Sequence, residues 1–136
     1  MQHPMTSIAS DGPMTVFGVG SPHPRTYGTF ARVLGSYVRE RNILSLEEAV
    51  RKMTSLPAQI LSIKQRGLIK EGYYADLTIF DPKIILDKAT FEDPHQYAIG
   101  VISVIVNGEI VIDQGVHNGN KPGRVLRGPG YNGSIN

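Results

Sequence analysis

The sequence predicts an α/β protein with two structural zones, residues 1–66 and residues 67–136. Three observations support this division. A short apolar segment at residues 5–10 comes first, and it is followed by stretches in which apolar residues recur every three or four positions, the period of a helix. The second half instead contains short β-prone runs separated by turn residues. This segregation of helices from strands differs from a repeating βαβ pattern.

The first predicted element is a buried strand at residues 5–10, which leads directly into Asp11-Gly12-Pro13. Such a strand delivers the Asp11 carboxylate to its C-terminal end. Because a strand without neighbours is unstable, it also indicates a sheet partner outside this chain. Residues 14–24 are predicted to be a loop, since they contain the breakers Gly18, Gly20, Pro22 and Pro24.

Three helices are expected after this loop. The first runs from Arg25 to about residue 38, where one apolar stripe comprises Tyr27, Phe30, Leu34, Tyr37 and Val38. The second begins after Ser45, an N-cap candidate with Glu48 three positions later, as in a capping box. The third covers residues 55–63, with Pro57 in its first turn, where a missing N–H costs little.

The second zone is predicted to be a set of strands. Residues 75–80 form a strand candidate that Asp81-Pro82 ends, and residues 83–97 give mixed signals. Residues 101–106 and 109–113 flank Asn107-Gly108, which indicates a hairpin with a type I′ turn. After Gly115 the chain is polar and rich in glycine, so a flexible tail is expected, frayed over residues 128–136.

Composition excludes several classes of protein. The chain has no cysteine, so it forms no disulfide and offers no thiolate ligand for a metal. No apolar run approaches the roughly 20 residues of a membrane span. The net charge is only +2 and the basic residues are scattered, which argues against nucleic acid as a partner. We expect a cytoplasmic location, since no signal peptide is recognisable.

Three residues are candidates for chemistry. Asp11, at the end of the predicted strand, occupies a position suited to a catalytic carboxylate. Arg25 begins a helix after a proline-bounded loop, a position from which a guanidinium can grip a carboxylate with two hydrogen bonds. His23 lies beside it. Spacing alone favours the plainer interpretations, namely a simple turn at Asp11 and solvated surface side chains at His23 and Arg25.

A complete metal site is not expected within this chain. Zinc requires three or four neighbouring ligands. The four histidines, at positions 3, 23, 95 and 117, are far apart in the sequence and form no His-x-His pair. The sequence also lacks a phosphate-binding P-loop and a Gly-x-Ser-x-Gly nucleophile elbow.

Several motifs, taken together and in order, resemble the N-acyl-D-amino-acid deacylase (D-aminoacylase) family of the amidohydrolase superfamily. They cover nearly the whole chain: Ser10-Asp11-Gly12, His23-Pro24-Arg25, Tyr27-Gly28-Thr29-Phe30, Leu46-Glu47-Glu48-Ala49-Val50, Ala75-Asp76-Leu77, Phe91-Glu92-Asp93-Pro94-His95 and Val106-Asn107-Gly108. The loop from Asp11 to His23 is slightly longer than the family's usual loop, which affects the substrate contacts expected there.

The resemblance implies a (β/α)8 barrel combined with a small β-sandwich. In this interpretation residues 1–66 supply the last barrel strand and the helices after it, and residues 67–136 supply sandwich strands. Asp11 matches the family's general base near the metal, and Arg25, with His23 beside it, matches the arginine that holds the substrate carboxylate. The resemblance further implies zinc in the complete enzyme, with ligands from earlier barrel strands that have no counterpart here.

We therefore expect a C-terminal deacylase segment, inactive in isolation, that acts on N-acyl-D-amino acids once a missing N-terminal barrel portion or a second subunit joins it. Self-association is also expected. Apolar side chains along residues 5–8 and along Tyr27, Phe30 and Leu34 should be exposed where barrel strands are absent. The alternatives are an inactive remnant that binds a partner chain through this barrel face, and an independent small-molecule-binding domain that uses Arg25.

Overall fold

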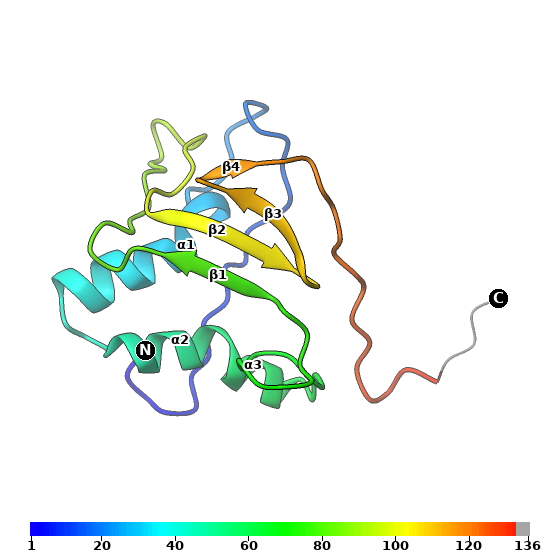
Figure 1. Ribbon diagram of the computed structural model, residues 1–136. Coiled ribbons are helices and arrows are strands. Elements are labelled where there is room, and N and C mark those ends of the chain that lie inside the picture. Colours follow the sequence, from blue (N-terminus) through cyan, green and yellow to red (C-terminus); the bar gives the residue numbers. More distant parts are fainter. Residues whose placement is uncertain (133–136) are drawn as a thin grey trace.

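The computed structural model describes residues 1–132 and consists of one antiparallel sheet with a helical layer beside it (Figure 1). The helices come first, followed by the strands, and the polypeptide after the last strand runs away from the sheet as an extended tail. This order agrees with the predicted segregation of helices from strands. The finer assignment to a barrel end and a sandwich portion stays a prediction.

The helical layer contains four elements: α1 (Arg25–Arg32), η1 (Val33–Glu40), α2 (Leu46–Met53) and α3 (Ser55–Ile60). The predicted first helix exists, but its second half, η1, is a π-helix, in which Arg41 N donates to Ser36 O at 2.9 Å. The predicted cap of α2 is confirmed, since Ser45 Oγ accepts from Glu48 N at 3.2 Å. The third helix ends three residues earlier than predicted.

The predicted strand at residues 5–10 is wrong. This segment pairs with no strand among residues 1–132 and instead lies along α2. Lys52 Nζ donates to the carbonyls of His3 and Thr6 at 2.6 and 3.0 Å, and Ile8 N donates to Lys52 O at 3.0 Å. An apolar segment without a neighbouring strand must find other partners for its backbone groups, and α2 provides them.

The sheet has four antiparallel strands in the order β1 (Leu77–Phe80), β2 (Val101–Val106), β3 (Glu109–Asp113) and β4 (Val116–His117). The predicted β2–β3 hairpin is confirmed, and Asn107 and Gly108 have the positive φ values of 50° and 85° that a type I′ turn requires. β4 was not predicted. It follows a second turn with two positive φ values, at Gln114 and Gly115.

The core joins the helical layer to the sheet. Ile85, which is 2% exposed, packs with Ala31, Val33, Leu34 and Ala49. Ile85 lies in the segment with mixed signals, whose regular structure is limited to one bridge between Leu86 and Ile99. The expected exposed stripe is wrong at Leu34, which is 7% exposed, although Phe30 and Met5 are 45% and 68% exposed. The two-zone division stays a prediction.

The tail after β4 contains no further strand up to residue 132, as expected. It is attached to the hairpin by Asn107, whose Nδ2 donates to Pro122 O at 2.6 Å. The expected fraying over residues 128–136 falls partly on residues 133–136, which lie outside the described residues.

Candidate functional site

Asp11 and Arg25, which the sequence nominated separately, form an ion pair. Arg25 Nη2 lies 3.1 Å from Asp11 Oδ2, and the two side chains are 44% and 86% exposed. The local backbone explains the approach: a Cβ on Gly12 would lie 3.0 Å from Thr26 Cα, a tight contact that glycine avoids where this segment passes the start of α1. Asp11 itself has a φ of 49°, a left-handed conformation that Asp tolerates better than most residues.

His23 organises the entry into α1. Its Nδ1 accepts from Arg25 N at 3.1 Å, which satisfies one of the free N–H groups at the helix start. The residue at the cap position, Pro24, provides no side-chain cap. The His23 ring also packs edge-on against Phe91, with centroids 4.9 Å apart. In the structure, His23 therefore contacts the backbone of Arg25 and orients the start of α1.

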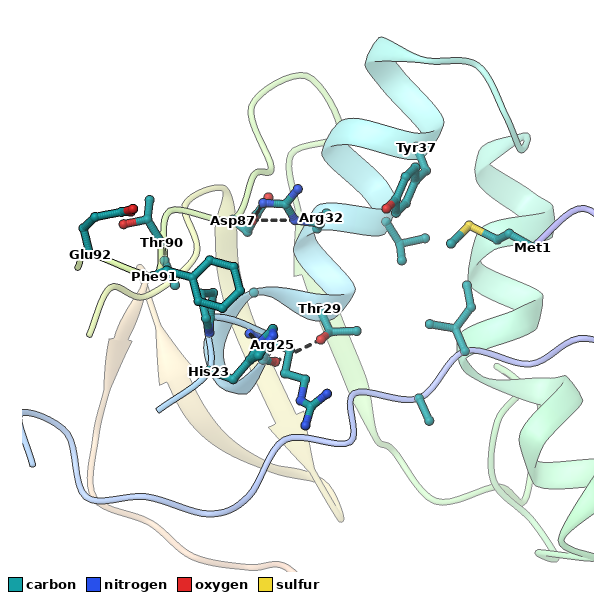
Figure 2. A pocket seen from close by; sticks show the side chains of 16 residues that line it. Met1, His23, Arg25, Thr29, Arg32, Tyr37, Asp87, Thr90, Phe91 and Glu92 are labelled. Atoms are coloured by element: carbon teal, nitrogen blue, oxygen red, sulfur yellow. Dashed lines mark hydrogen bonds and ion pairs between the residues drawn. The ribbon is translucent and has the colours of Figure 1, made fainter. Parts of the chain in front are cut away.

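A cavity of about 490 Å³ opens beside these residues (Figure 2). Figure 2 shows the α1 residues Arg25 and Thr29 near the centre of the site, with Phe91 and Glu92 to one side and Met1 to the other. Arg25 thus lines the cavity with its partner Asp11 beside it, and three segments that are far apart in the sequence bound it: residues 1–9, residues 23–37 and residues 87–92.

A second ion pair supports the far end of this cavity. Arg32 Nε and Nη2 lie 2.9 and 2.7 Å from Asp87 Oδ2, and the Asp87 side chain is only 7% exposed. This pair connects α1 to the segment that leads to Phe91. Because Arg32 is already engaged with a buried carboxylate, Arg25 is the better candidate for binding an anionic ligand from solvent.

The described residues do not fit a zinc centre. Within residues 1–132, no three His, Asp or Glu side chains come close enough together to hold a metal ion. The partner of Asp11 is a guanidinium, which repels a cation and donates to the carboxylate that a metal would otherwise bind. A zinc site containing Asp11 therefore requires ligands from outside these residues.

Two residues with organising roles were missed by sequence reasoning. His95 contacts Tyr27 and the loop after Asp11, which lie 68 to 77 positions away in the sequence. In the sequence this residue stands out only as one of four scattered histidines. Lys52, on the predicted apolar helix α2, is fully buried and holds the segment before Asp11. No local pattern marks such contacts, since each joins segments that only the folded chain brings together.

Charged side chains of α2 also help to hold the segment before Asp11 in place. Two hydrogen bonds from Arg51, at 2.7 and 2.8 Å, lower the pKa of Glu48 to about 2. Arg51 also donates to Pro4 O at 2.7 Å, and Glu48 Oε1 lies 3.3 Å from Lys52 Nζ. The Glu48 carboxylate thus keeps both cations in place above the N-terminal segment.

Among residues 1–132, each helix falls short of the length and hydrophobicity that crossing a bilayer requires.

Comparison with known proteins assigns the chain to a family. The model of the amidohydrolase family matches residues 1–112. N-acyl-D-aspartate deacylase from Alcaligenes xylosoxydans xylosoxydans is 46% identical over 125 residues, which are 91% of this chain and 24% of that protein. D-aminoacylase from the same organism is 49% identical over 105 residues, which are 77% of this chain and 22% of that protein. The chain spans about a quarter of the length of these relatives.

Solved structures agree with the sequence comparison. A crystal structure of D-aminoacylase matches with a TM-score of 0.76 and 49% identity, covering 78% of this chain and 22% of that chain. N-acyl-D-glutamate deacylase from Bordetella bronchiseptica, in complex with zinc and a phosphonate inhibitor, matches with a TM-score of 0.82 and 43% identity, covering 93% of this chain and 26% of that chain. The resemblance inferred from the motifs is confirmed, and the chain belongs to the amidohydrolase family.

Proposed function

We propose that this chain is a segment of a zinc-dependent amidohydrolase that hydrolyses the amide bond of N-acyl-D-amino acids. The observation that carries the proposal is the Asp11–Arg25 pair, which places a carboxylate and a guanidinium side by side at the edge of an open cavity. Three relatives that match most of this chain are named as deacylases of this kind. Further polypeptide, from the same chain or from a second subunit, supplies the rest of the site.

Arg25 is proposed to bind the α-carboxylate of the substrate. Its guanidinium already holds a carboxylate, that of Asp11, so its geometry suits such a ligand. Both side chains are substantially exposed, and exchange of one carboxylate for another at the surface costs little free energy. A substrate carboxylate that takes the place of Asp11 frees that side chain, so that substrate binding and release of Asp11 are coupled.

Asp11, once released, is proposed to act as the general base. Its carboxylate accepts the proton of the attacking water and then gives that proton to the leaving nitrogen as the amide bond breaks. Zinc in the complete enzyme polarises the amide carbonyl and activates water. Since the described residues form no zinc cage, we expect the purified chain alone to hydrolyse no N-acyl-D-amino acid.

The test is a chimera in which this chain replaces the matching segment of D-aminoacylase from Alcaligenes xylosoxydans xylosoxydans. We expect the chimera to release free D-amino acid from N-acetyl-D-amino acids in the presence of zinc. Asp11→Asn should lower kcat at least about a hundredfold, the scale of a lost general base. Arg25→Lys should mainly raise KM, because lysine cannot form the paired hydrogen bonds.

Exposed residues of the same types provide matched controls. Asp113→Asn changes an acid on β3, and Arg124→Lys changes a base in the tail, and both positions are exposed. Neither control should alter the kinetics. An active chimera that is insensitive to Asp11→Asn would contradict the role of Asp11, and an inactive chimera that folds and binds zinc would contradict the proposed function.

A second candidate function is a binding module without catalysis. The observation that favours it is the exposure of Met1, Met5 and Phe30, which are 44%, 68% and 45% exposed. Such a module would associate with a partner chain or with itself through this apolar face. The wild-type chain and the Asp11→Asn variant would then bind the partner equally well.

A further inference from the structure

The loop between Asp11 and Arg25 is hydrogen-bonded to a distant side chain, that of His95. Nδ1 of His95 lies 3.1 Å from Gly18 N and 3.1 Å from the Tyr27 hydroxyl, and Nε2 lies 2.9 Å from Gly20 O. Two of these partners lie in the loop and the third lies in the first turn of α1. His95 therefore ties the whole connection between the proposed base and the proposed carboxylate clamp to the segment after Phe91.

The two backbone contacts determine which ring nitrogen carries the proton. The Gly20 carbonyl can only accept a hydrogen bond, so Nε2 donates to it. The Gly18 N–H can only donate, so Nδ1 accepts from it. His95 is consequently a neutral imidazole protonated at Nε2, and Tyr27 also donates its hydroxyl proton toward Nδ1. Thr15 Oγ1, 3.3 Å from the Tyr27 hydroxyl, extends the network to another loop residue.

Aromatic packing holds the same loop from a second side. The Phe17 ring stacks on Tyr97 with centroids 4.7 Å apart, and it meets His95 and Tyr27 edge-on at 5.5 and 5.8 Å. Gly18 and Gly20 both have positive φ values, of 81° and 71°. A loop with two such glycines has many accessible conformations, so without these attachments its ordering would be entropically costly.

We infer that His95 is a positioning residue of the deacylase site, which holds the loop at residues 12–24 in one conformation and so fixes the placement of Asp11 and Arg25 at its two ends. The catalytic part of this inference rests on the proposed function. A site that is ordered before substrate arrives loses less conformational entropy on binding. His95 lies outside the Ile85-centred core, so its removal releases the loop and leaves the core packing in place.

The first experiment measures the loop in the full chain by NMR. The ring nitrogen shifts of His95 should report a proton on Nε2. In His95→Ala, the Gly18 amide should exchange with solvent about tenfold faster, the factor expected when one or two hydrogen bonds are lost. His95→Asn should restore much of the protection, because asparagine Oδ1 can take the place of Nδ1 as the acceptor. His117→Ala is the matched control, since His117 Nδ1 accepts from Gly119 N at 2.9 Å outside this loop.

The second experiment measures kinetics in the active chimera described above. His95→Ala should raise KM for an N-acetyl-D-amino acid about tenfold with a smaller change in kcat, since binding loses preorganisation and the reacting groups remain. His95→Asn should bring KM back toward the wild-type value. His117→Ala should leave both constants unchanged.

The outcomes separate this inference from the proposed function. A proton on Nδ1, or Gly18 exchange that is the same in His95→Ala, would overturn the anchoring of the loop. An unchanged KM in an active chimera would overturn the positioning role. A wild-type chimera that folds and binds zinc but is inactive would overturn the proposed function. The catalytic part of the inference would fall with it. The NMR result would still decide whether His95 anchors the loop.

Discussion

Gly28 and Asp87 pack so closely that a Cβ on Gly28 would lie 2.7 Å from the Cβ of Asp87. Glycine inside a helix ordinarily weakens it. In the folded chain it allows α1 to approach the segment that carries Asp87, which lets Arg32 reach the buried carboxylate. The glycine thus contributes to one wall of the candidate site.

We predict that Gly28→Ala destabilises the chain by about 1–3 kcal/mol, the range for overpacking a close contact. The atom in the way is the Cβ of Asp87, which cannot rotate aside. Urea unfolding followed by circular dichroism measures the change. The matched control is Gly123→Ala, where an added Cβ meets no atom within 4 Å. Equal stability of the two variants would show that α1 and the Asp87 segment are not in close contact.

Lys52→Met should lower the free energy of unfolding by about 1–3 kcal/mol and expose residues 3–8 to protease. The substitution keeps an unbranched side chain and removes the ammonium that donates to His3 O and Thr6 O. Limited proteolysis with mass spectrometry locates the first cleavage. Lys88→Met, at an exposed position, is the control and should leave the digestion pattern unchanged.

The Glu48–Arg51 ion pair on α2 should make the stability of the folded chain depend on pH in the acid range. Hydrogen bonds from Arg51 lower the pKa of Glu48 from 4.5 to about 2. A carboxyl whose pKa is depressed in the folded state contributes stability above its unfolded pKa, and this contribution is lost as the pH falls from about 4.5 toward 2. A carbon NMR titration of the Glu48 carboxyl measures its pKa directly.

Comparing stability at pH 6 and pH 3 in the wild type and in Glu48→Gln then isolates the contribution of this group. The variant should lose less stability between these two values than the wild type does. Titration of Glu48 near its ordinary value would contradict the paired arrangement.

Arg66 connects the β2–β3 hairpin turn to the segment that leads into β1. It forms an ion pair with Asp76, donates to Asn107 Oδ1 at 2.5 Å and lies over the Tyr74 ring at 4.2 Å. Arg66→Lys keeps the charge and loses the planar group that serves all three partners, so we expect about 1–2 kcal/mol of destabilisation. Thermal unfolding measures it. Arg124→Lys, in the exposed tail, should leave the melting temperature unchanged.

Elements with a local signal were predictable from the sequence. Ser45 caps α2 through its own hydroxyl, and Asn107-Gly108 forms its turn through its own backbone preference, so both were predicted at the positions where the structure has them. The widening of the first helix into η1 and the short strand β4 were not found. Gln114 adopts a positive φ in the turn between the paired strands β3 and β4, at a position where Asn or Asp is usual, so the sequence carries no turn signal there.

The candidate site was predictable only in part, because local sequence patterns do not record contacts between distant segments. Asp11 and Arg25 were recognised from a family pattern, while their direct contact was not expected. His95 could not be placed, because its partners Tyr27, Gly18 and Gly20 are brought to it by the fold of the whole chain. Residues that orient a site through distant contacts leave no periodicity in the sequence.

The segment before Asp11 is held by side chains of α2 and one backbone hydrogen bond, without a strand ladder. A ladder forms cooperatively along its length, whereas these attachments can break one at a time. The segment can therefore be peeled from α2 stepwise while the four-stranded sheet stays whole. Under the proposed function, a strand supplied by further polypeptide would pair with residues 5–10 by exchanging one set of hydrogen bonds for another, without unfolding the rest of the chain.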